Sequence, residues 1–255
     1  MSKLKETIGR VHLAHKVNYI VKTKEDSFEA TLSGRFHYQA VSKSDYPVVG
    51  DYVQIRGEDT KIIERVVERK SALYRTYVNK KAEKQVLASN VDIIFICMSM
   101  NQDFNMKKLQ NFVSLTYNSE AKVVILLTKK DLEKNNQSYI DKVQSEYDYE
   151  VLPIRVYDTS SIDQVKAIIG KQTAVLVGSS GVGKSSLINR IIGEKHLEVK
   201  DIRESDAQGR HTTSHRELIE LDSGGSIIDT PGIRIVTNHL TDDIDGKFDQ
   251  INDFV

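Results

Sequence analysis

The chain has 255 residues, and its 36 lysine and arginine residues balance 36 aspartate and glutamate residues. This length suggests two domains, and a hydrophobic share of 39% excludes a chain that is disordered throughout. The sequence has no run of about 20 apolar residues, which a membrane-spanning helix needs, so we expect a cytoplasmic protein without a membrane partner.

Residues 1–68 contain short β-rich runs that are separated by turn-forming residues. The runs lie at 10–21, 28–36, 47–55 and 61–67. Several short strands in a small unit indicate a barrel, because closure removes exposed strand edges. We therefore predict a small all-β barrel of five strands.

Residues 69–84 form a basic segment, which we predict to be a linker. It holds six basic residues and one acidic residue, and Tyr74 and Tyr77 lie among them. With Phe36, His37 and Tyr38 of the barrel, these side chains could contact RNA phosphates and stack on bases. A solvated linker with packed tyrosines explains the charge pattern equally well.

From residue 85 the pattern changes to long apolar runs that alternate with helical periodicity. Such runs are typical of parallel strands buried on both faces, so we predict an α/β domain over residues 85–240. An acidic segment, residues 241–255, follows. The single cysteine, Cys97, lies inside one apolar run and is predicted to be a buried thiol.

Two helices are predicted from their end signals. Ser160 and Asp163 have the spacing of a capping box, which starts a helix that should end near Gly170. A second helix should run from Lys184 to Ile192 and stop at Gly193.

The segment 178–185, GSSGVGKS, matches the phosphate-binding pattern G-x-x-x-x-G-K-[ST] between a strand and a helix. Such a loop points backbone N–H groups and a helix N-terminus at phosphate. Lys184 should reach the β- and γ-phosphates, and Ser185 should bind Mg²⁺. The nucleotide-binding residues predicted here are Gly178, Ser179, Ser180, Gly181, Val182, Gly183, Lys184, Ser185 and Ser186. A glycine-rich turn without a ligand is the alternative.

A second motif, DTPG at residues 229–232, follows a short apolar run. Asp229 stands where a second Mg²⁺-linked acid is expected, and the N–H of Gly232 could face a γ-phosphate. Taken alone, the motif could equally be a plain turn.

The third motif is Thr128, Lys129, Lys130 and Asp131, at the end of an apolar run. The Asp131 carboxylate could accept hydrogen bonds from the N1–H and amine of guanine, while the Lys129 stem lies over the base. Taken alone, the motif is also consistent with a helix N-cap.

The three motifs together resemble the signature set of the GTPase superfamily, with the TKKD motif placed before the phosphate loop. This order resembles the circularly permuted GTPases, and most closely the ribosome small subunit-dependent GTPase A family. Further segments similar to that family are Gln85, residues 88–92, residues 103–105, residues 209–213 and residues 47–51.

The resemblance implies an OB-fold barrel followed by a circularly permuted P-loop GTPase domain with a mostly parallel sheet. It implies a monomeric late assembly factor of the 30S ribosomal subunit that binds 16S rRNA and guanine nucleotides. Hydrolysis of GTP to GDP and phosphate should be slow unless the subunit stimulates it, because Ile233 follows the DTPG motif where Ras-like enzymes have a glutamine.

The resemblance also implies roles in the switch segment. Thr212 or Thr213 should contact the γ-phosphate, and one of them should hold Mg²⁺ together with Ser185 and Asp229. His211 is a candidate for positioning the attacking water.

The chain departs from the family pattern in two further places. The family continues into a zinc domain with three cysteines and a histidine, which this sequence lacks, so no zinc is expected. The loop that usually carries a serine-alanine pair reads Ile154, Arg155 and Val156 here, which predicts weaker guanine binding. The alternatives are a P-loop ATPase or small-molecule kinase, and a non-hydrolysing guanine-nucleotide-binding regulator.

Overall fold

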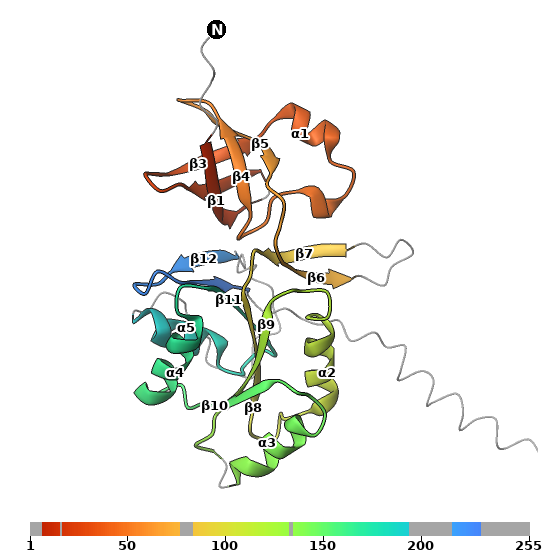
Figure 1. Ribbon diagram of the computed structural model, residues 1–255, viewed down its shortest axis with the longest axis vertical. Coiled ribbons are helices and arrows are strands. Elements are labelled where there is room, and N and C mark those ends of the chain that lie inside the picture. The colour runs from red at the N-terminus through yellow and green to blue at the C-terminus, as the bar shows by residue number, and fades with distance from the viewer. Residues whose placement is uncertain (1–6, 16, 77–83, 133–134, 194–215, 231–255) are drawn as a thin grey trace, which may run out of the picture.

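The computed structural model describes residues 7–15, 17–76, 84–132, 135–193 and 216–230. These residues form a barrel at one end of the molecule and an α/β unit at the other, with a β-hairpin between them (Figure 1). No helix in these ranges is both long enough and apolar enough to cross a membrane.

The N-terminal unit is a closed five-stranded barrel, as predicted. Its strands are β1 (Thr7–Ala14), β2 (Asn18–Lys22), β3 (Ser27–Leu32), β4 (Tyr52–Arg56) and β5 (Lys61–Val66). The order around the barrel is β1, β2, β3, β5, β4, and the antiparallel pairing of β4 with β1 closes it. Apolar side chains such as Val11, Val21, Val53 and Ile63 fill its interior.

The prediction of a strand over 28–36 was wrong in its second half. Strand β3 ends at Leu32, and helix α1 (Gly34–Gln39) follows, because the Ser33 hydroxyl caps it by accepting a hydrogen bond from the Phe36 N–H at 3.0 Å. The Phe36 ring is buried in the barrel core, so it cannot stack on RNA, whereas Tyr38 is 92% exposed. A short 3₁₀ turn, η1 (Lys43–Asp45), lies between α1 and β4.

The second unit is a mostly parallel sheet with helices on both faces, which confirms the predicted α/β class. Its strands are β8 (Ile93–Ser99), β9 (Lys122–Thr128), β10 (Glu150–Pro153), β11 (Thr173–Gly178), β12 (Glu217–Glu220) and β13 (Ser226–Asp229). Its helices are α2 (Met106–Ser114), α3 (Asn136–Gln144), α4 (Thr159–Ile169) and α5 (Lys184–Ile192). The strand order is β10, β9, β8, β11, β13, β12, and only β12 runs antiparallel to its neighbour in this unit.

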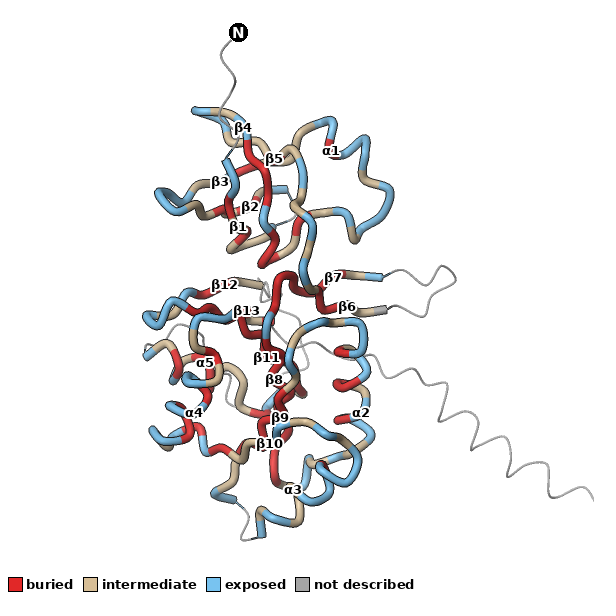
Figure 2. Tube along the Cα trace, viewed as in Figure 1, coloured by how far each residue is buried: buried red, intermediate tan, exposed pale blue. Residues whose placement is uncertain are grey.

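The strands are apolar throughout because both faces of the sheet are covered. Ile94, Ile96 and Met98 of β8 face a core that contains α2 and α3 side chains. Phe95 and Cys97 of the same strand face a second core that contains α4 and α5 side chains. Figure 2 shows the resulting band of buried residues along the central strands, with exposed residues on the outer helices.

Helix α5 has the predicted bounds, but α4 begins differently from the prediction. Its N-cap is Asp158, whose carboxylate accepts the Ser161 N–H at 3.3 Å, and Ser160 lies inside the first turn. Both residues are favoured caps, so the sequence did not distinguish them.

The segment predicted as a basic linker contains a strand. Strand β6 (Ala72–Thr76) pairs antiparallel with β7 (Lys84–Ser89), and the intervening Tyr77, Lys80 and Lys81 lie outside the described residues.

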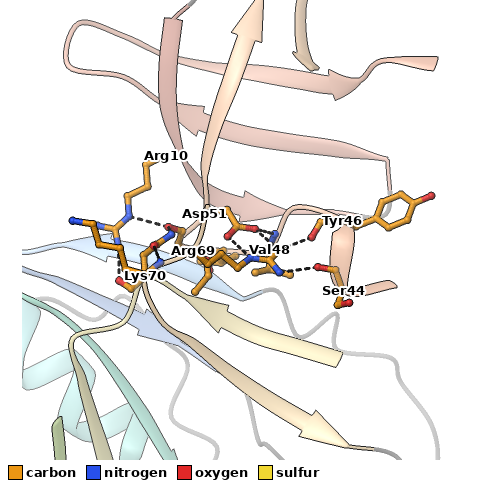
Figure 3. A network of polar contacts seen from close by, with 11 residues as sticks. Arg10, Ser44, Tyr46, Val48, Asp51, Arg69 and Lys70 are labelled. Carbon is orange, nitrogen blue, oxygen red and sulfur yellow. Dashed lines mark hydrogen bonds and ion pairs between the residues drawn. The ribbon is translucent and has the colours of Figure 1, made fainter. Parts of the chain in front are cut away.

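A buried polar network lies at the end of the barrel that faces the α/β unit (Figure 3). The Asp51 carboxylate is fully buried and accepts hydrogen bonds from Arg69 Nε at 2.7 Å and Nη2 at 2.8 Å. Arg69 also donates to the carbonyls of Ser44 and Tyr46. Arg69 belongs to the basic segment for which RNA contact and a solvated linker were both open, and its guanidinium group is committed to this network.

Other contacts cross the joint between the barrel and the α/β unit. The Arg10 guanidinium of β1 donates to the Gly50 carbonyl at 3.3 Å and to Thr173 Oγ1 of β11 at 2.9 Å. Leu13 of β1 pairs with Glu217 of β12, so the barrel and the α/β strands form one continuous sheet. These bonds fix the barrel against the α/β unit.

Candidate nucleotide-binding site

The predicted phosphate loop connects the end of β11 to the start of α5. Gly178 is required at the strand end because its φ is +153° and an added Cβ would lie 2.5 Å from the Cys97 carbonyl oxygen. Gly183, with φ of +100°, is the N-cap of α5 and has no side chain to cap the helix. The backbone N–H groups of the first helical turn therefore face the loop without a side-chain cap, which suits an anion.

Lys184 holds its amine inside this loop. Its Nζ donates to the carbonyls of Gly178 at 2.8 Å and Ser179 at 2.6 Å. Burial lowers the pKa of the Lys184 amine, and the nearby charge of Asp229 opposes that shift. The amine is therefore positioned where a bound phosphate could replace the two carbonyls.

The other loop residues differ in exposure. Ser180 and Gly181 are exposed, Val182 is buried, and Ser185 and Ser186 in the first turn of α5 are partly buried. The loop therefore packs against the core through Val182 and is exposed to solvent at Ser180 and Gly181.

Cys97 lies beneath the loop at the C-terminal part of β8. It is buried, as the sequence predicted, and burial raises the pKa of its thiol to about 12. The thiol is therefore neutral and acts as packing for the Gly178 backbone.

The predicted guanine motif lies beside the phosphate loop. Thr128, at the end of β9, is fully buried, and its hydroxyl donates to the Val182 carbonyl at 2.8 Å. Lys129 follows with φ of +62°, a left-handed conformation that is uncommon outside glycine. The Thr128 bond could not be predicted from the sequence, because its partner is 54 positions away.

Asp131 and its neighbour are paired with the loop that follows β10. The Asp131 carboxylate is partly exposed, with Oδ2 lying 3.8 Å from Arg155 Nε. Lys130 Nζ lies 3.7 Å from Asp158 Oδ2, and the Lys130 N–H donates to the Ile154 carbonyl at 3.2 Å. The loop after β9 and the loop after β10, which would surround a base, are therefore connected by two ion pairs and a backbone hydrogen bond.

Asp229 ends β13, the strand next to β11, and is partly buried. The following residue, Thr230, is buried and donates its hydroxyl to the Leu176 carbonyl at 2.8 Å, which fixes the turn. The predicted residues His211, Thr212, Thr213 and Gly232 lie outside the described residues.

The described part of the chain has no group of three or more histidine, cysteine, aspartate or glutamate side chains that could hold a metal. The Ser185 hydroxyl and the Asp229 carboxylate are oxygen donors of the kind that Mg²⁺ prefers. Together with phosphate oxygens and water they fit an Mg²⁺ that arrives with a nucleotide.

Comparisons with known proteins identify related chains. The RsgA GTPase family model matches residues 66–238. "Small ribosomal subunit biogenesis GTPase RsgA 1" of Oceanobacillus iheyensis is 36% identical over 236 residues, covering 90% of this chain and 67% of the relative. "Small ribosomal subunit biogenesis GTPase RsgA 2" of Lactiplantibacillus plantarum is 38% identical over 236 residues, covering 90% and 66%.

Two solved structures share the fold. The crystal structure of YjeQ from Thermotoga maritima gives a TM-score of 0.68 at 24% identity and covers 89% of this chain and 75% of that one. The structure of YloQ, described as a circularly permuted GTPase, gives 0.61 at 24% identity and covers 93% and 75%. The chain spans about two thirds of the length of the curated relatives that it matches. The match over most of its length shows that the chain belongs to the RsgA GTPase family.

Proposed function

We propose that this chain binds guanine nucleotides and hydrolyses GTP to GDP and phosphate during assembly of the small ribosomal subunit. The observation that carries the proposal is the bond from Thr128 to the Val182 carbonyl. This bond joins Thr128 of the predicted guanine motif to Val182 of the predicted phosphate loop, which supports a shared site although the guanine motif precedes the loop along the chain. Curated relatives are named as small ribosomal subunit biogenesis GTPases.

The phosphates would bind at the N-terminus of α5. Backbone N–H groups of the loop and of the first helical turn would donate to phosphate oxygens, and the Lys184 amine would exchange its two carbonyl acceptors for them. Ser185, Asp229 and Thr212 or Thr213 would hold Mg²⁺, which offsets the negative charge of the phosphates. His211 and the Gly232 N–H remain the proposed groups around the γ-phosphate and attacking water.

The base would be selected by Asp131. A carboxylate accepts from the N1–H and amine of guanine, and adenine has no matching donor pair at that edge. Asp131→Asn should therefore shift preference from GTP towards xanthosine triphosphate, because the amide can donate to the extra carbonyl of xanthine. Unchanged GTP preference in a competition assay would remove Asp131 from this role.

We further propose that the barrel is an OB-fold that contacts 16S rRNA. In this proposal the barrel domain ends at residue 68 and the GTPase domain begins at residue 85, with a linker between them. OB-folds bind single strands with basic grooves and exposed aromatic rings, and Tyr38 is an exposed ring on this barrel. The contact should be mainly to phosphates, so affinity for 30S subunits should fall steeply as salt rises. We propose that the chain acts as a monomer.

Hydrolysis of GTP and ATP by the purified chain with Mg²⁺, with and without 30S subunits, tests the proposal. We expect slow GTP turnover that the 30S subunit stimulates, and no ATP turnover above background. Turnover of ATP as fast as GTP would instead indicate an ATPase or kinase. GTP binding without turnover in both conditions would indicate a non-hydrolysing regulator.

A further inference from the structure

Arg155 occupies an unusual place beside the predicted guanine acceptor. It follows β10 between Ile154 and Val156, which are both buried, and its Nε lies 3.8 Å from Asp131 Oδ2. The side chains of Arg155 and Asp131 are 52% and 38% exposed. The pair therefore sits at the surface, where a ligand can separate its members.

The backbone around Arg155 is held in place by a separate set of bonds. The Arg155 N–H donates to Ser161 Oγ at 3.2 Å, and that hydroxyl donates to Asp158 Oδ2 at 2.8 Å. Ser161 is buried, and Asp158 also faces the Lys130 amine. Because these bonds do not involve the Arg155 side chain, we expect a substitution there to leave them in place.

The guanidinium group and the guanine base offer a carboxylate the same kind of partner. Each presents neighbouring N–H donors on one planar edge, and a carboxylate can accept such a pair with both oxygens. We propose that Arg155 is an affinity-determining residue that pairs with Asp131 when no nucleotide is bound and must be displaced by guanine. This inference rests on the proposed role of Asp131 in guanine binding.

Competition between Arg155 and guanine for Asp131 predicts how large the change in affinity should be and which nucleotides it should affect. Exposed ion pairs contribute little, and removing such a competitor should tighten guanine nucleotide binding roughly twofold to fivefold. Adenine does not use Asp131, so weak ADP binding should not change. Because salt screens an exposed pair, the gain should be largest at low ionic strength.

Equilibrium binding of fluorescent GDP by the whole chain tests the proposal. Arg155→Met keeps the aliphatic length and removes the charge and the donors. We expect this variant to bind GDP roughly twofold to fivefold more tightly than the unmodified chain at low salt, with a smaller gain at high salt. Arg56→Met is the control, because Arg56 is 50% exposed and pairs with Glu64 in the barrel, outside the predicted nucleotide site, and it should bind GDP as the unmodified chain does.

A second pair of variants isolates the contact with Asp131. In an Asp131→Asn background, measured with xanthosine diphosphate, the carboxylate partner is gone and Arg155→Met should have no effect. Equal or weaker GDP binding by Arg155→Met alone would overturn the competition, as would an equal gain for ADP or in the Asp131→Asn background. If the unmodified chain binds no GDP at all, the proposed function fails, and the inference that rests on it fails with it.

Discussion

The joint between barrel and sheet and the guanine side of the nucleotide site both depend on ion pairs, but the two regions differ in burial. At the joint, Asp51 is fully buried and meets Arg69 through two hydrogen bonds of 2.7 and 2.8 Å. At the guanine side, Asp131 and Arg155 are partly exposed and lie 3.8 Å apart. The first pair is a fixed structural element, and the second can open.

The difference follows from the cost of exposing each charge. Separating a buried pair leaves at least one charge without water, so the joint keeps a single arrangement. Separating a surface pair costs little because water replaces the partner. The ion pair beside the barrel therefore keeps one arrangement, whereas the ion pair at the predicted guanine site can separate.

The largest expected effect on stability comes from breaking the buried pair of Asp51 and Arg69 at the joint. Asp51→Asn removes the negative charge that neutralises Arg69, and the arginine is committed to this buried network. We expect a loss of about 3–5 kcal/mol in the free energy of unfolding, measured by urea denaturation.

The control for the joint is an exposed pair of the α/β sheet, Lys122 and Glu150, whose side chains are 56% and 44% exposed. Glu150→Gln removes the charged partner of Lys122 and should cost less than about 1 kcal/mol. Equal losses in the two variants would contradict the distinction between a fixed joint and exchangeable surface pairs.

Lys184 represents a third case, a partly buried charge that donates to two backbone carbonyls and lies near the charge of Asp229. Lys184→Ala should weaken GTP binding by about 1.5–3 kcal/mol, because charged hydrogen bonds to phosphate are lost. The measurement is titration calorimetry with GTP, with the exposed Lys166→Ala as the control, which should bind normally. If Lys184→Ala lost the same binding free energy with GDP as with GTP, the amine would contact the β-phosphate and not the γ-phosphate.

Much of this organisation could be predicted from sequence because it depends on local patterns. The uninterrupted apolar run at residues 93–98 predicted a strand buried on both faces, and the glycine spacing at residues 178–185 predicted the turn into α5. The α1 helix was missed because a short apolar run such as 28–36 fits a strand or a helix, and only the Ser33 cap decides between them.

The bonds that position the site could not be predicted, because their partners are far apart in the chain. Arg69 lies in a basic segment whose charge pattern fitted either RNA contact or a solvated linker, yet it pairs with Asp51, 18 residues away and just before β4. Charge patterns show which residues are charged, and only the fold shows which charges meet. The same applies to the contact between Asp131 and Arg155.

The smallest effect is expected at Thr128, where the two halves of the nucleotide site meet. Thr128→Val keeps the shape of the side chain and removes the hydroxyl that donates to the Val182 carbonyl. Because Val182 belongs to the phosphate loop, the lost bond of about 1 kcal/mol should lower both stability and nucleotide affinity. Thr116→Val is the matched control, since that buried hydroxyl donates at 2.7 Å to the Val113 carbonyl at the end of α2. It should lower stability by a similar amount and leave GDP affinity unchanged. If both variants bound GDP normally, the Thr128 bond would serve folding alone, and the guanine motif would be positioned by the surface pairs around Lys130 and Asp131.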